Sequence, residues 1–100
     1  YTRAAEVIDE IAERILTLEG QPLHTLNDYV EKSNIKVVAN VNDAKQAVEA
    51  VIDNVLYLLE KERELLAVAD AYNDEGTTTL LSDVVVEQEK LIWMLNSTLK

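Results

Sequence analysis

The sequence has 100 residues, of which 48% are hydrophobic, and this length and composition suit one small domain with a single core. Nineteen acidic against nine basic residues give a formal net charge of −10, so the surface repels nucleic-acid phosphates and anionic membranes and attracts cations. The absence of cysteine excludes disulfides and thiolate metal sites and is compatible with a reducing, cytoplasmic compartment. No apolar run reaches the ~18 residues that a membrane span requires.

The first predicted element is a helix from the start of the sequence to about Glu19. Only two glycines and one proline occur in the whole chain, which favours a few long helices over many strands. With ~100° between residues, one broad apolar arc forms from Ala4, Ala5, Ile8, Ile11, Ala12, Ile15, Leu16 and Leu18. Because no initiator methionine and no capping box precede this pattern, we expect the sequence to begin inside a helix.

Two carboxylates at the border of this arc form the candidate site. Asp9 and Glu13 are four residues apart, so on a helix they stack one turn apart on the same side. A hard metal ion can be held by such a pair. The alternative is a solvated acidic edge, with Glu10 and Arg14 as an ordinary ion pair four residues apart.

A loop and a short helix should follow. Gly20 is expected as the left-handed residue that ends the first helix, and Pro22 prevents its continuation. Thr25 is the expected N-cap of a short helix that ends near Glu31. The single histidine, His24, precedes this helix, and we expect it to have a surface or packing role. The connector 33–40 contains an Ile-Lys-Val-Val run that is too short and solitary to form a sheet.

Two longer helices complete the pattern. The first should begin at Asn42 or Asp43 and run to about Asn73, roughly 45 Å, with one buried stripe formed by Ala44, Val48, Val51, Ile52, Val55, Leu58, Leu59, Leu65, Leu66 and Ala69. A stripe of that length needs equally long partners, which predicts a helical bundle. After a turn at 73–76, Thr77 or Thr78 should cap the last helix, whose apolar side contains Leu80, Leu81, Val84, Val85, Leu91, Ile92, Leu95 and Leu99.

The last helix has a second apolar surface. Val86 and Trp93 are seven residues apart and fall almost opposite the main stripe. We expect this surface to contact another subunit, and the alternative is a tryptophan packed on a neighbouring loop.

Three segments resemble the Dps-type mini-ferritins, the DNA-binding proteins from starved cells. They are Asp9-Glu10-Ile11-Ala12-Glu13-Arg14, then Gly20-Gln21-Pro22-Leu23 with Thr25-Leu26, and Glu87-Gln88-Glu89-Lys90-Leu91-Ile92-Trp93-Met94-Leu95. The resemblance covers essentially all 100 residues in order. It implies an all-α, ferritin-like four-helix bundle with a short extra helix in the middle connection. It also implies that residues 1–100 form a single partial domain, which lacks the first helix and the start of the second.

The resemblance further implies an iron-oxidising and iron-storing protein whose twelve subunits form a hollow shell. In this family a two-iron centre lies between two subunits, and hydrogen peroxide oxidises Fe(II) there. Asp9 and Glu13 match the family's carboxylate ligands, with histidines supplied by another subunit from segments upstream of this motif. Asp70, Asp74 and Glu75 match an acidic ion pore, although a solvated turn is the alternative for Asp74 and Glu75. DNA binding would depend on segments outside these 100 residues.

Two other functions stay open from the sequence. One is a non-catalytic helical assembly or DNA-protecting protein of the same fold without a working iron centre. The other is an unrelated helical-bundle interaction protein. Histidines immediately upstream of the sequence would favour iron oxidation over the first alternative, and a monomeric full-length protein would favour the second.

A polypeptide limited to residues 1–100 should self-associate, because the long apolar stripe at 44–69 would have too few partners to cover it. Light scattering and circular dichroism measure this directly. A well-folded monomer would contradict the prediction.

Overall fold

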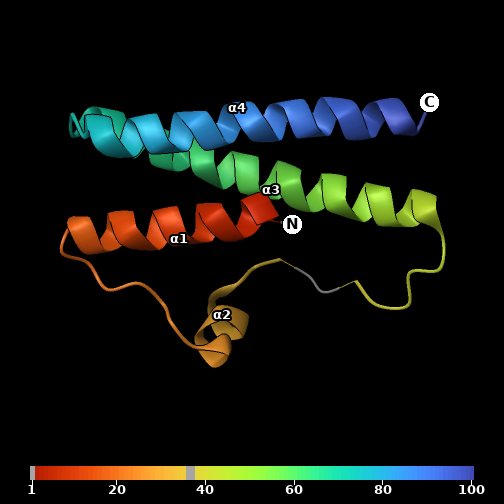
Figure 1. Ribbon diagram of the computed structural model, residues 1–100, viewed down its shortest axis with the longest axis horizontal. Coiled ribbons are helices and arrows are strands. Elements are labelled where there is room, and N and C mark those ends of the chain that lie inside the picture. The colour runs from red at the N-terminus through yellow and green to blue at the C-terminus, as the bar shows by residue number, and fades with distance from the viewer. Residues whose placement is uncertain (1, 36–37) are drawn as a thin grey trace. The chain divides into compact units, whose positions relative to one another are not determined.

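The computed structural model describes residues 2–35 and 38–100, which form four helices and, within those ranges, no strand (Figure 1). The predicted all-α class is therefore confirmed. In chain order the helices are α1 (Thr2–Thr17), α2 (Leu26–Lys32), α3 (Ala44–Ala71) and α4 (Glu75–Thr98). The chain divides into two compact units, Tyr1–Asn34 and Ile35–Lys100. The expectation of a single partial domain stays a prediction, and two residues of the Ile-Lys-Val-Val run, 36 and 37, lie outside the described residues.

Helix α1 ends in a left-handed turn one residue earlier than predicted. Glu19, rather than Gly20, has the positive φ of 67°, and its N–H donates to the Leu16 carbonyl at 2.9 Å. The Gly20 N–H then donates to the Ile15 carbonyl at 2.8 Å, which completes a Schellman motif. A Cβ on Gly20 would lie 3.0 Å from Ile15 Cγ2 and 3.3 Å from the Ile15 carbonyl oxygen, and these tight contacts favour glycine at the second position. The left-handed residue is Glu19, so the prediction that Gly20 would be left-handed was wrong.

Helix α2 begins as the sequence predicts. The Asp28 N–H donates to Thr25 Oγ1 at 3.1 Å, so Thr25 is the N-cap. The Tyr29 hydroxyl donates to the Leu23 carbonyl at 3.3 Å, which connects the helix to the loop before it. The predicted short helix is therefore confirmed, and it ends at Lys32, one residue beyond Glu31.

Helix α3 is the longest element, with 28 residues and a length of roughly 42 Å. Asp43 caps it, since Asp43 Oδ1 accepts from the Lys45 N–H at 2.9 Å. The predicted start is confirmed. The helix ends at Ala71, two residues before the predicted end, because Tyr72 is its C-cap and Asn73 adopts a φ of 57°.

Helices α3 and α4 lie side by side and antiparallel, and their contact forms the core of the second unit (Figure 1). The buried apolar side chains of this α3–α4 seam are Ile52, Val55, Leu59 and Ala69 from α3 with Leu81 and Val84 from α4. Not all of the predicted α3 stripe is buried, since Val51, Leu58 and Leu65 remain 45%, 37% and 55% exposed. Those three positions lie to one side of the line of residues that α4 covers, so the prediction of one fully buried stripe was too broad.

A tight turn joins α3 to α4, and Asp74 serves both helices. Its N–H donates to the Ala69 carbonyl at 2.8 Å, while the Asn73 N–H donates to the Asp70 carbonyl at 3.0 Å, in a second Schellman motif. The Asp74 carboxylate then caps α4: Oδ1 accepts from the Thr77 N–H at 3.2 Å and Oδ2 from the Thr77 hydroxyl at 2.6 Å. The prediction of Thr77 or Thr78 as the N-cap was wrong, because Asp74 already supplies the acceptor and α4 begins at Glu75.

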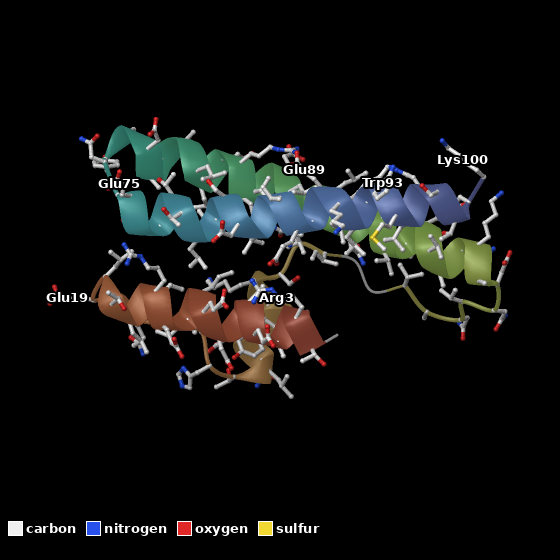
Figure 2. All side chains as sticks on the ribbon, turned by 45° about the horizontal axis from the view of Figure 1, so that its top comes forward. Arg3, Glu19, Glu75, Glu89, Trp93 and Lys100 are labelled. Atoms are coloured by element: carbon white, nitrogen blue, oxygen red, sulfur yellow. The ribbon has the colours of Figure 1, made fainter. Side chains whose placement is uncertain are left out.

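An ion pair on the outside of the seam also joins the two helices. Arg63 Nη2 on α3 lies 2.9 Å from Oε2 of Glu89 on α4, and Figure 2 labels the position of Glu89. Both side chains are about half exposed, so we expect this pair to contribute less than ~1 kcal/mol. Burial of the apolar seam is therefore the main attraction between α3 and α4.

No described helix is long and apolar enough to cross a membrane.

Replacing Asp74 by alanine should lower the free energy of unfolding by about 1–2 kcal/mol, because the first turn of α4 loses its cap. Urea denaturation followed by circular dichroism measures this loss. Asp74→Asn is the matched control, since its amide oxygen can still accept from the Thr77 N–H. Equal stability of the alanine and asparagine variants would contradict the capping role.

Candidate metal centre

Asp9 and Glu13 lie where the sequence predicts, on consecutive turns of α1. Both side chains are exposed. On an α-helix this spacing places the two Cβ atoms about 5–6 Å apart on one side, so one ion can reach both carboxylates. The backbone beneath Glu13 is also fixed near the end of the helix, because its carbonyl accepts from the Thr17 hydroxyl at 2.8 Å.

The acidic residues on the adjacent side of α1 are in a different environment. Arg3 Nη1 lies 3.1 Å from Glu6 Oε2 and 3.1 Å from Glu10 Oε1. This cluster is centred about 70° round the helix from Asp9 and Glu13. The helix therefore separates acids that pair with an arginine from a second pair of acids at the border of the apolar arc.

The chemistry of this pair fits a hard cation, but two side chains are too few for a complete site. Carboxylate oxygens suit Fe(II), which also accepts nitrogen ligands. Among the residues that the structure describes, no three or more His, Cys, Asp or Glu side chains gather closely enough to hold a metal ion. A metal bound by Asp9 and Glu13 would therefore take its other ligands from water or from outside these residues.

The three turn acids differ from one another. Asp74 uses both carboxylate oxygens to cap α4. Asp70, in the last turn of α3, and Glu75, the first residue of α4, are exposed. Glu75 marks the end of α4 that adjoins the turn, as Figure 2 shows. The turn thus presents two solvated carboxylates and one that is engaged in holding the backbone.

Similarity to known proteins shows the family to which this chain belongs. The model of the ferritin-like domain matches residues 1–100. A DNA protection during starvation protein from Bacillus anthracis is 38% identical over 99 residues, which are 99% of this chain and 68% of that relative. The chain belongs to the Dps-type branch of the ferritin-like family.

Solved Dps structures agree with this membership. A Dps protein from Vibrio cholerae O1, described as a member of a superfamily of ferritin-like diiron-carboxylate proteins, has a TM-score of 0.97 and 42% identity. The match covers 100% of this chain and 63% of the Vibrio cholerae chain. A Dps protein from Bacillus brevis has a TM-score of 0.95 and 33% identity, with 100% and 67% covered. The predicted ferritin-like fold is confirmed, and an unrelated helical bundle is excluded.

The chain spans only part of its relatives. An uncharacterised protein from Haemophilus influenzae is 40% identical over 97 residues, which are 97% of this chain and 61% of that protein. The chain thus spans about two-thirds or less of the length of the relatives it matches. The roles of Asp9, Glu13 and the turn acids stay predictions.

The outward side of α4 carries the second apolar surface that the sequence predicts. Trp93 is 66% exposed and Val86 is 64% exposed. In Figure 2, Trp93 lies in the half of α4 nearer to Lys100 and far from Glu75. Within the second unit these side chains are thus not used to hold α4 against α3.

One acid, Glu62, is buried although the sequence pattern predicted no buried acid. Glu62 on α3 is only 9% exposed, and burial raises its pKa above the ordinary value, while a hydrogen bond from the Gln88 side chain and the charge of Arg63 act in the opposite direction. A signal was present: Glu62 falls in the 3-4 spacing of Ile52, Val55, Leu59, Leu66 and Ala69. Because glutamate is seldom buried, this spacing alone does not predict that its side chain faces the seam.

Proposed function

We propose that the protein oxidises Fe(II), with hydrogen peroxide as the preferred oxidant, and stores the product in a hollow shell of identical subunits, twelve by analogy with the family. Removing Fe(II) and peroxide together would protect DNA from oxidative damage. The observation that carries the proposal is the exposed Asp9–Glu13 pair on one side of α1 in a chain of the Dps-type family.

In this proposal Asp9 and Glu13 bind the Fe(II) substrate. Asp9 binds or bridges iron, and Glu13 binds the same ion from one turn later, while histidines of another subunit complete the two-iron centre. Two Fe(II) ions would each give one electron to one hydrogen peroxide, whose O–O bond would break and which, with two protons, would leave as two water molecules. Two carboxylates leave coordination positions open for that oxidant.

The acidic surface supports delivery of the substrate. With a formal net charge of −10, the chain attracts cations, and the exposed Asp70 and Glu75 would add to that attraction at the pore that the family resemblance implies. Asp74 would act there mainly by fixing the backbone, since its carboxylate is engaged by Thr77. The same charge disfavours this part of the chain as the anchor for DNA, so we assign DNA protection to iron and peroxide removal.

Replacing Asp9 and Glu13 together by alanine in the full-length protein should slow peroxide-dependent Fe(II) oxidation roughly tenfold or more, because one side of the centre loses its ligands. Stopped-flow absorbance measures the rate. Anaerobic calorimetry with Co(II) measures binding separately, and the tight phase should be lost.

The matched control is Glu6→Ala with Glu10→Ala, which removes two carboxylates four residues apart from the same helix. These acids pair with Arg3, so the control should keep the oxidation rate. An unchanged rate in the Asp9/Glu13 variant would refute the site assignment. A wild-type protein that oxidises no Fe(II) would instead support the non-catalytic alternative of the same fold.

Trp93→Glu or Val86→Glu should shift the full-length assembly toward smaller species, because each substitution places a charge on an apolar surface that we propose lies between subunits. Sedimentation velocity gives the distribution of species. Thr98→Glu adds the same charge at an exposed position of α4 that lies about 140° round the helix from Trp93, and it should leave the assembly intact. If both apolar-surface variants assembled as the wild type does, the surface would not be a subunit contact.

A further inference from the structure

The α3–α4 seam contains one carboxylate among its aliphatic side chains. Glu62 follows Leu59 by three residues and precedes Ala69 by seven, so it lies on the side of α3 that faces α4. It is the one charged residue among the buried side chains that the structure describes. A carboxylate in this position carries a desolvation cost that an apolar residue would not.

A second polar residue lies across the seam. Gln88 occupies the inner side of α4, between Val84 and Ile92 in the sequence, and its side-chain amide lies near enough to the Glu62 carboxyl to act on its pKa. One oxygen on each partner is left over: Glu62 Oε1 and Gln88 Oε1 are both buried without a hydrogen-bond partner among the described residues. Leaving these two acceptor oxygens buried without a hydrogen-bond donor costs free energy, so the arrangement lacks one donor.

A single proton satisfies both oxygens. An ionised carboxylate can only accept, and an amide oxygen can only accept, so the charged form leaves both unpaired. A protonated Glu62 has an O–H that Gln88 Oε1 can accept, while the Gln88 amide donates to the other Glu62 oxygen. We propose that Glu62 is a neutral carboxylic acid in the folded protein and forms a two-hydrogen-bond acid–amide pair with Gln88, so that the α3–α4 hairpin is a proton-sensitive element.

The charges around Glu62 are consistent with a neutral acid. On its own helix the neighbouring cations are Arg63, which lies 2.9 Å from Glu89 on α4, and Lys61, which lies 3.6 Å from Glu64. Each cation next to Glu62 thus has another carboxylate as its partner. Burial is the largest influence on Glu62 and raises its pKa, against the smaller effects of Gln88 and Arg63.

The direction of the pH dependence follows. Because the pKa of Glu62 in the folded state lies above its ordinary value of 4.5, folding takes up a proton between those two values. The contribution of the pair to stability is complete below the ordinary pKa and is lost as pH rises through the raised pKa. The hairpin should therefore loosen on the alkaline side, which is opposite to the behaviour of a carboxylate stabilised by a salt bridge.

Glu62→Gln in the full-length protein tests this directly, since a glutamine amide can replace the protonated acid and make both hydrogen bonds. Its Tm should match that of the wild type at about pH 4 and exceed it by ~4 °C or more at about pH 8. Glu60→Gln removes the same charge from an exposed position of α3 and should reproduce neither effect. A Tm difference for Glu62→Gln that is independent of pH, or a loss of stability at pH 8, would overturn the proposal.

Two further measurements distinguish a proton on Glu62 from other partners, such as a bound cation, that could satisfy the two unpaired oxygens. Exchanging the partners, Glu62→Gln with Gln88→Glu, should restore the wild-type pH dependence, because the acid then lies on α4. The carboxyl carbon of Glu62 in ¹³C NMR should titrate above the ordinary range. A titration midpoint at or below the ordinary value would overturn the proposal, as would saturable Co(II) binding at this pair at neutral pH that Glu62→Gln abolishes.

Discussion

Burial of aliphatic side chains between α3 and α4 is the interaction on which the second unit depends. Its fully covered positions are few and small, with Leu59 and Val84 at 2% and 1% exposure. Among the described residues no aromatic ring is buried in this seam, so the helices approach through branched aliphatic residues and alanine. The Schellman turn at 69–74 and the Asp74 cap then fix where α3 ends and α4 begins, and thereby which residues face each other across the seam.

The helices themselves could be predicted from the sequence because their signals are local. Apolar spacing located the three long helices, and the starts of α2 and α3 follow from Thr25 and Asp43, which are good N-caps. The turn before α4 was harder, because Asp74, Thr77 and Thr78 are all capping residues and spacing alone does not choose among them. The choice was made by the left-handed Asn73, which positions Asp74 to end one helix and begin the next.

The candidate metal site shows a different limit. The helical register of Asp9 and Glu13 is a local property and is confirmed, but a metal centre also needs ligands that no spacing within α1 can supply. The role of the pair therefore depended on a resemblance to a family, whereas the position of the pair did not. Glu62 and Gln88 show the opposite case: each lies in the apolar period of its own helix, but only the packing of α3 on α4 reveals that they meet.

Four kinds of carboxylate in this acidic chain illustrate how environment assigns a role to one chemical group. Glu6 and Glu10 neutralise Arg3 at the surface, and Asp74 uses both oxygens to hold backbone and hydroxyl donors. Asp9 and Glu13 lie exposed on consecutive turns, where a cation can approach both. Glu62 is the one buried acid among the residues that the structure describes, and there the charged form is the costly one. Charge density therefore says little about which acid could bind iron. Exposure and spacing favour Asp9 and Glu13, while burial against an amide makes Glu62 a group that holds a proton.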